Sequence, residues 1–375
     1  MSMRTAAPRL WVASMAAMAL CAGAALAADP KDEPRPHEWL ARMNDALTKG
    51  NYDGTFFHVR QSGVETLRII HRVQDGETRE RLVSLDGSGR EFIRDGNELV
   101  CYLPDQRTVL VERRPQEGPL LGNLPRFDES LAASYEVKSS ERARLMGRDT
   151  RLVVVHPRDD YRYGYRLWID EKTAMPLKTQ LCDARGNVIE QVVFSSLTMR
   201  SQIPDAAFKP DVQADGFRWV RQDPRSVNEA STPILWSAIR LPPGFRMASR
   251  SKQTMPGAAA PVAHLVFTDG VASVSVFVES RAESQSTPAG ATLSGAAQMG
   301  SSSAFSTTID GHQVTAVGEV PPQTVRFIAS QVKAEAPRAV SRPPAPRRFA
   351  PPVPGSIPEK SPGPAPAFAP RDPPR

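Results

Sequence analysis

The spacing of apolar residues changes early in the chain from a helical period to a strand period. After Pro36, four apolar side chains fall on one face of a helix: Trp39, Leu40, Met43 and Leu47. Gly50 follows as a stop signal. In residues 54–60 and 65–73 apolar and polar side chains then alternate, which is typical of half-buried strands. The pattern predicts a short amphipathic helix followed by a sheet.

Turn signals recur at short, regular intervals after this change. They are Ser62-Gly63, Asp75-Gly76, Asp86-Gly87, Asp95-Gly96 and Pro104-Asp105. Asp-Gly favours tight hairpins because both residues tolerate a positive φ. We therefore expect an antiparallel meander, interrupted by a helix near residues 126–134 and resumed by strands up to about residue 197.

The later part of the chain divides into a linker, a second folding region and a tail. Residues 203–229 are polar and punctuated by proline, which predicts a linker between a sheet domain at 28–202 and a smaller domain at 230–333. The smaller domain has hairpin signals at Asp269-Gly270 and Asp310-Gly311. A final helix is expected after Pro321-Pro322, with Val325, Ile328 and Val332 at helical spacing. The architecture expected is α+β.

Residues 334–375 hold 14 of the 35 prolines of the chain and show no apolar period. This composition predicts a disordered, proline-rich tail. Deleting the residues after Lys333 is expected to leave folding and partner binding intact.

The first 27 residues have the form of a secretory signal peptide. Arg4 and Arg9 precede an apolar run, and Ala25-Leu26-Ala27 predicts cleavage after Ala27. Export to the periplasm is therefore expected. The net charge of +6 comes from this leader (+2) and the tail (+4), which leaves the body neutral. A neutral body argues against a nucleic-acid groove.

Residue patterns that carry catalysis or metal binding are not evident. The six histidines lack metal-ligand spacing, and no nucleophile elbow, phosphate loop or C-x-x-C motif occurs. One Ser-x-x-Lys match, Ser249 to Lys252, lacks its partner motifs and is interpreted as chance in a polar loop. Asp159-Asp160 is interpreted as a turn. No enzymatic activity, metal or cofactor is predicted.

The stretch YRYGYRLWID, residues 161–170, is interpreted as a strand with an aromatic face. Tyr161, Tyr163, Tyr165, Leu167 and Ile169 point one way, and Arg162, Gly164, Arg166 and Trp168 point the other. Two interpretations remain open: sheet core, or the wall of an apolar cavity between a curved sheet and its helices. The two cysteines outside the leader, Cys101 and Cys182, lie in predicted strands, and a disulfide and two buried thiols are equal alternatives.

Three long segments resemble the MucB/RseB family, periplasmic negative regulators of the sigma-E envelope-stress response. They are WLARMNDALTKGNYDGTFFHVR, RERLVSLDGSGREFIRDGNELVCYLPD and PRDDYRYGYRLWIDEKTAMPLKTQLCDARGNVIEQVVFSSL. The resemblance covers about residues 37–333, is weaker after Ile203, and does not include the tail.

The resemblance implies a half-open antiparallel barrel closed by helices, similar to periplasmic lipoprotein carriers. It also implies binding to the periplasmic segment of a membrane-anchored anti-sigma factor, which is shielded from proteolysis until lipid or lipopolysaccharide displaces the regulator. The residues that contact the anti-sigma factor are not indicated, and homo-oligomerisation is left open. In such a barrel the candidates for lining a lipid cavity are Tyr163, Tyr165, Leu167, Trp168 and Phe194. The alternatives are a plain lipid or lipoprotein carrier and an exported hydrolase, which the missing motifs disfavour.

Overall fold

A computed structural model describes residues 34–87, 89–113, 120–121, 124, 131–222, 236–253, 261–280 and 295–335. The predicted leader, the last residues of the predicted linker (223–229) and nearly all of the predicted tail lie outside these residues. We refer to the described residues from 34 to 222 as the large-sheet region and to those from 236 to 335 as the small-sheet region.

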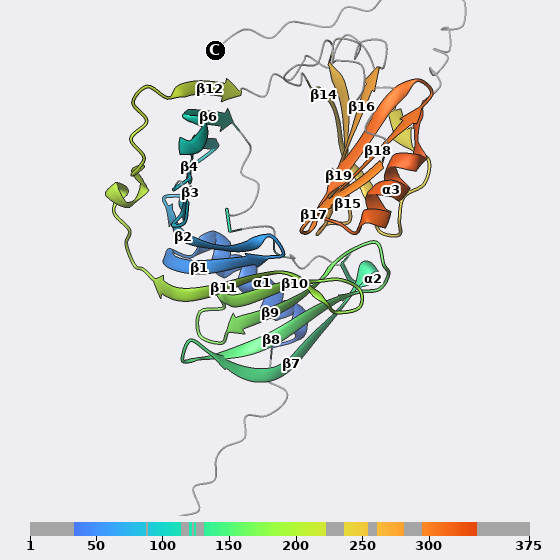
Figure 1. The fold of residues 1–375 in the computed structure, drawn as a ribbon. Helices are drawn as coiled ribbons and strands as arrows, with labels where there is room; N and C mark the ends of the chain where they lie inside the picture. The colour runs from blue at the N-terminus through green and yellow to red at the C-terminus, as the bar shows by residue number, and fades with distance from the viewer. Residues whose placement is uncertain are drawn as a thin grey trace, which may run out of the picture. The chain divides into compact units, whose positions relative to one another are not determined.

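The large-sheet region is one 12-stranded sheet with the order β12-β6-β5-β4-β3-β2-β1-β11-β10-β9-β8-β7 (Figure 1). Its strands are β1 (Tyr52–Arg60), β2 (Gly63–Gln74), β3 (Glu77–Ser84), β4 (Glu91–Asp95), β5 (Glu98–Leu103), β6 (Thr108–Arg113), β7 (Tyr135–Leu145), β8 (Arg148–Pro157), β9 (Gly164–Asp170), β10 (Pro176–Cys182), β11 (Val188–Met199) and β12 (Arg218–Gln222). Its helical elements are α1 (Pro36–Lys49), η1 (Pro104–Gln106), α2 (Leu131–Ser134) and η2 (Asp205–Phe208). The sheet is not closed among the described residues, since β12 and β7 are its two edges.

The predicted hairpins follow the backbone requirements of their turns. At the β2–β3 turn, Asp75 and Gly76 have φ values of 53° and 82°. Two consecutive positive φ values match the twist of an antiparallel ribbon, and Asp-Gly adopts them at low cost. The meander predicted from these signals is confirmed for β1 to β6, in which each strand pairs with the next.

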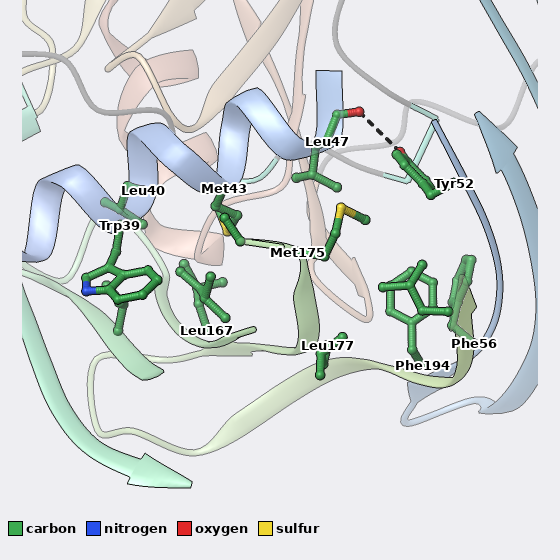
Figure 2. Close-up of a cluster of buried hydrophobic side chains, with 14 of the residues drawn as sticks. Trp39, Leu40, Met43, Leu47, Tyr52, Phe56, Leu167, Met175, Leu177 and Phe194 are labelled. Atoms are coloured by element: carbon green, nitrogen blue, oxygen red, sulfur yellow. Dashed lines mark hydrogen bonds between the residues drawn. The ribbon is translucent and has the colours of Figure 1, made fainter. Parts of the chain in front are cut away.

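Helix α1 packs against one face of this sheet. Trp39, Leu40, Met43 and Leu47 are its buried residues, as its apolar period predicted, and Gly50 ends it. Figure 2 shows these side chains lying over Leu167 and Leu177 of the sheet. Burial of such side chains contributes roughly 1.5–3 kcal/mol each, so α1 and the sheet stabilise one another.

The small-sheet region has its own sheet and its own core. Six strands follow the order β14-β15-β16-β19-β18-β17, and β13 pairs separately with β20. The elements are β13 (Trp236–Ala238), β14 (Arg246–Gln253), β15 (Val262–Thr268), β16 (Ser273–Ser280), β17 (Gly295–Met299), β18 (Ser302–Ile309), β19 (His312–Gly318), α3 (Pro322–Gln331) and β20 (Val332–Ala334). Val325, Ile328 and Ala329 of α3 are fully buried in the core of this region.

Several sequence predictions are wrong in detail. The predicted linker contains β12, which pairs in parallel with β6; five residues are too few to show a period. Ser249 and Lys252 lie on β14 rather than in a loop. Val332 continues the chain as β20 after α3 has ended. Of the helix predicted at 126–134, the structure describes only Leu131–Ser134.

Candidate functional site

The stretch 161–170 is a strand only from Gly164 onward. Tyr161, Arg162 and Tyr163 precede β9 and form a turn with Asp159 and Asp160. The prediction of a single strand from Tyr161 is therefore wrong, whereas the turn predicted at Asp159-Asp160 is confirmed. Gly164 leaves no room for a side chain, because a Cβ there lies 2.8 Å from the Val155 carbonyl oxygen. Strand β9 begins at this close approach to β8.

Two of the five cavity candidates lie in the apolar cluster under α1. Leu167 is fully buried, and Phe194 is 3% exposed with its ring 5.5 Å from that of Phe56. Figure 2 shows Leu167 beneath Trp39 and Met43, and Phe194 beside Phe56. The face of β9 that carries Leu167 is thus the face that α1 covers.

The other three candidates have different surroundings. Tyr165 is partly buried against the same cluster, and burial raises the pKa of its hydroxyl. Trp168 is half-buried on the opposite face of β9, where the Nζ atom of Lys178 lies 4.6 Å from its ring centroid. Tyr163 is buried outside the strand and lies beside Ser303 of β18 in the small-sheet region. A lining role for these five residues stays a prediction.

The cluster under α1 combines flexible and bulky side chains. Met43 and Met175 are fully buried in it and Met199 packs at its margin. Methionine has three rotatable bonds and adapts to irregular space. Leu120, Leu121 and Leu124 also pack against the cluster. An apolar cluster with this composition tolerates changes in packing at low cost in rotamer strain.

A buried polar group lies beside this cluster on β2 and β3. Glu80 is fully buried, forms an ion pair with Arg94 at 3.0 Å and accepts a hydrogen bond from the Leu120 amide at 3.0 Å. Burial raises the pKa of Glu80 and lowers that of His71, whose ring stacks on Tyr52 with centroids 4.8 Å apart. Glu80 therefore fixes the backbone of the segment that carries Leu120 next to the apolar cluster.

A pocket of about 430 Å³ lies where β8 begins and β9 ends. Its lining is mostly polar: Gly147, Arg148, Asp149, Asp170, Lys172, Thr173, Leu197, Thr198 and Met199. None of the five cavity candidates is among these residues. Arg148 forms an ion pair with Asp170 at 3.4 Å and donates to the Leu197 carbonyl oxygen at 2.6 Å. This pocket is chemically unlike the acyl-chain cavity expected from the sequence.

The two sheet regions meet at the turn before β9. The fully buried guanidinium of Arg162 donates to Asp269 Oδ2 at 2.8 Å and to Asp159 Oδ1 at 3.0 Å. Asp269 lies at the β15–β16 hairpin and also accepts the Tyr135 hydroxyl at 3.0 Å. Sequence reasoning missed this group, because Asp269-Gly270 was interpreted only as a turn and Arg162 only as an outward strand residue. The signal available was an arginine among aromatics directly after two aspartates.

A second polar contact between the regions is centred on Glu190 of β11. Its Oε1 atom accepts the Ser301 amide at 2.9 Å, and its Oε2 atom lies 3.1 Å from His58 Nε2. These hydrogen bonds, first of all that with His58, lower the pKa of Glu190 to about 2. Glu190 is therefore ionised and holds the β17–β18 turn against the large sheet.

Cys101 and Cys182 are buried thiols with no bridge between them. They lie on β5 and β10, and five strands separate these two in the sheet. Neighbouring strands are about 4.8 Å apart, whereas a disulfide needs Cα atoms within about 7 Å. The structure therefore has two buried thiols in place of the disulfide alternative.

The part of the chain that the structure describes has neither a metal-ligand cluster nor a membrane-spanning helix. That part contains no group of three histidine, cysteine or acidic side chains placed to hold a metal ion. Within the same residues, no helix has both the length and the apolar character to cross a membrane.

Comparisons with known proteins match both regions. The model of the MucB/RseB N-terminal domain matches residues 35–212, and that of the MucB/RseB C-terminal domain matches residues 230–333. The chain is 32% identical to the sigma factor AlgU regulatory protein MucB of Pseudomonas aeruginosa over 80% of this chain and 91% of that protein. It is 28% identical to the sigma-E factor regulatory protein RseB of Salmonella typhimurium over 87% and 98%.

Solved structures agree with these matches. The complex of Pseudomonas aeruginosa MucA and MucB has a chain that superposes with a TM-score of 0.62 at 28% identity, covering 80% of this chain and 99% of that one. A second structure, MucB in complex with MucA(peri), gives a TM-score of 0.60 at 28% identity, with 80% and 98% covered.

Proposed function

Since this chain belongs to the MucB/RseB family, we propose that it is a non-catalytic periplasmic regulator that binds the periplasmic segment of a membrane-anchored anti-sigma factor. Bound there, it shields the segment from regulated proteolysis, and lipid or lipopolysaccharide releases it. The chain reaches the periplasm by a cleavable leader at residues 1–27. The observation that carries the proposal is the match to a relative solved in complex with MucA, which extends over nearly all of that relative's chain.

The proposed organisation assigns one role to each region. Residues 28–202 form a half-open barrel of the lipoprotein-carrier type that senses lipid, and residues 230–333 form a domain that takes part in partner binding. The open edge at β7 and the apolar cluster under α1 support the first assignment. Residues 203–229 connect the two, and assembly into homo-oligomers is compatible with this organisation.

Release by lipid requires a difference in affinity between two states. Lipid must bind the free regulator more tightly than the complex, because a ligand with equal affinity for both shifts nothing. Changing the ratio of free to bound regulator from 1:99 to 99:1 takes a difference of about 5.5 kcal/mol in the binding free energy of lipid. Each buried CH₂ contributes about 0.8 kcal/mol. About seven additional buried methylenes therefore suffice, which is less than one acyl chain.

The first experiment is capture of the chain, without its leader, by the immobilised periplasmic segment of a single-span anti-sigma factor. We expect retention in the absence of lipid and release on addition of lipopolysaccharide. A chain that is folded by circular dichroism and is not retained would overturn the proposal. Protection of the captured segment from a site-1-type protease is measured in the same samples.

The cavity assignment has a matched pair of variants on neighbouring residues. Leu167→Met changes the shape of the cluster under α1 at nearly constant volume, and Trp168→Met changes the opposite face of β9. We expect Leu167→Met to shift the lipid concentration that releases half of the bound segment, and Trp168→Met to leave it unchanged. Equal release curves for folded wild type and both variants would make β9 a scaffold only.

The second candidate is a plain lipid or lipoprotein carrier. The methionine-containing cluster under α1 favours it, because acyl-chain binding needs only the large-sheet region. A carrier binds acyl chains and does not retain the anti-sigma segment, so the capture experiment separates the two functions.

A further inference from the structure

One short turn of the large-sheet region makes several contacts with the small-sheet region, in addition to the Glu190–Ser301 contact. We call residues 158–163 the docking turn. Its Tyr161 carbonyl oxygen accepts the Thr324 hydroxyl at 2.7 Å, and the Tyr161 ring lies 5.5 Å from that of Phe327. Its Asp160 carbonyl oxygen accepts the Gln323 side chain. Helix α3 of the small-sheet region therefore sits against this turn through both backbone and ring contacts.

Arg162 is the centre of the docking turn, and its side chain is fully enclosed by both regions. The guanidinium bonds to Asp159 within its own turn and to Asp269 and the Pro243 carbonyl oxygen across the contact. Its carbon Cζ lies 5.4 Å from the Tyr135 ring centroid and 5.2 Å from that of Phe245. One aromatic ring belongs to each region, so separation of the regions exposes the arginine on one side and Asp269 on the other.

A buried ion pair contributes little net free energy to a contact, so such a contact opens readily. Removing two charges from water costs several kcal/mol per ion, and the attraction between them roughly offsets that cost. When the regions part, the pair is lost but both charges regain their hydration. The net contribution of this pair to docking is therefore small, while the planar guanidinium defines the geometry of the docked state.

Apolar contact between the regions is limited but present. Val271, two residues after Asp269 in the β15–β16 hairpin, packs against the apolar cluster under α1. The hairpin thus touches the candidate lipid-binding cluster and the docking turn at the same time. Val271 and Asp269, two positions apart in this hairpin, therefore connect that cluster with the Arg162–Asp269 pair.

We propose that the Arg162–Asp269 pair is a latch that couples the two sheet regions: with the pair intact they behave as one cooperative unit, and without it they separate while each remains folded. Arg162 acts as a positioning residue, since it sets the small-sheet region against the docking turn. The latch concerns this chain alone, so its test involves neither anti-sigma factor nor lipid and is independent of the proposed function.

The test uses Asp269→Asn in the full chain without its leader. Asparagine is isosteric and keeps an oxygen for the Val271 and Ala272 amides, which Asp269 Oδ1 accepts at 2.9 and 2.7 Å. It removes the charge that faces Arg162 and places an NH2 donor where Oδ2 accepts Arg162 and the Tyr135 hydroxyl. We expect wild type to unfold in one calorimetric transition and Asp269→Asn in two, separated by about 5 °C or more. X-ray scattering should show a larger radius of gyration for the folded variant.

Two controls distinguish uncoupling from simple destabilisation. Arg81→Met breaks the buried pair between Arg81 and Glu91, joined at 2.9 Å inside the large-sheet region. We expect it to lower the melting temperature and keep a single transition. Thr324→Val removes a neutral hydrogen bond at the same contact and should also keep a single transition.

Three results would overturn the latch. One is a single transition and an unchanged radius of gyration for Asp269→Asn, and another is two transitions for Arg81→Met as well. The third is failure of both Asp269→Asn and Arg162→Lys to fold, which would assign the pair to folding of the chain rather than to coupling.

Discussion

The two sheet regions bury apolar side chains of different kinds. The cluster under α1 mixes aromatic rings, leucines and the methionines Met43 and Met175. In the small-sheet region, half of the described buried cluster is valine, exemplified by Val274, Val276 and Val314. Valine is branched at Cβ and has one strongly preferred rotamer in many settings, whereas methionine adapts. The difference indicates an adaptable core in one region and a rigid one in the other.

The two regions also differ in how deeply their ion pairs are buried. The large-sheet region buries carboxylates against arginines on its strands, as at Glu91 with Arg81 and Glu80 with Arg94. In the small-sheet region the Arg250–Glu335 pair is exposed, at 3.2 Å. A buried pair restricts which strand registers are compatible with a satisfied core. The large sheet, with more strands to order, carries more of these restrictions.

The largest expected effect compares two leucines that are both fully buried. Leu167→Ala removes side-chain volume beneath Met43, and Leu265→Ala removes it from the valine-rich cluster. Leu→Ala in a core costs about 2–5 kcal/mol, depending on how far the site collapses. We expect about 2–3 kcal/mol for Leu167→Ala and about 4–5 kcal/mol for Leu265→Ala, measured by urea unfolding. Equal losses, or a larger loss at Leu167, would remove the distinction between an adaptable and a rigid core.

The next effect concerns Glu190, whose pKa of about 2 lies below the ordinary 4.5. Since the folded-state pKa is depressed, its stabilising contribution is complete above about pH 4.5 and disappears as pH falls through about 2. Solvent reaches this carboxylate and weakens its interactions. We therefore expect the free energy of unfolding of wild type to exceed that of Glu190→Gln by about 1 kcal/mol at pH 6. The difference should shrink towards zero at pH 2.5 in parallel urea titrations. A difference that does not change with pH would show that the Ser301 contact does not depend on charge.

A smaller effect is expected at the exposed pair of the small-sheet region. Arg250→Ala removes the ion pair with Glu335, and exposed pairs contribute about 0–1 kcal/mol. We expect a loss below about 0.5 kcal/mol that vanishes in 1 M salt. A loss above about 2 kcal/mol would mean that surface charge stabilises this region as buried charge stabilises the other.

The smallest effect is expected from reductant. Cys101 and Cys182 are separate buried thiols, whereas a bridge closing so long a loop would contribute on the order of 4 kcal/mol. Dithiothreitol should therefore leave the melting temperature unchanged, and titration of the denatured chain without its leader should find two thiols. A fall in melting temperature of several degrees on reduction would contradict the strand order.

The sequence predicted the local features well because each depends on neighbouring residues. The face of α1, the stop at Gly50 and the turn at Asp75-Gly76 follow from helical period and φ preference alone. The parallel pairing of β12 with β6 depends on a partner more than a hundred positions away, and no periodicity records it.

The site was harder to predict for a related reason. Alternation along β9 placed Leu167 and Trp168 on opposite faces, but the covered face is decided by where α1 packs. Arg162 and Asp269 gave no recognisable motif, since their pairing is created only when the small-sheet region meets the docking turn.

The pairing of β1 with β11 joins two sets of strands that are each consecutive in sequence. Tyr52 lies opposite Met199, while β1 to β6 and β7 to β11 are each built from strands adjacent in sequence. Local hairpins form in microseconds, and joining distant strands is slower because a long loop must close first. Until β11 arrives, β1 is an open edge that carries the exposed Phe57. A β11 strand from another copy offers the same pairing, so we expect domain swapping and aggregation to compete with folding at this junction.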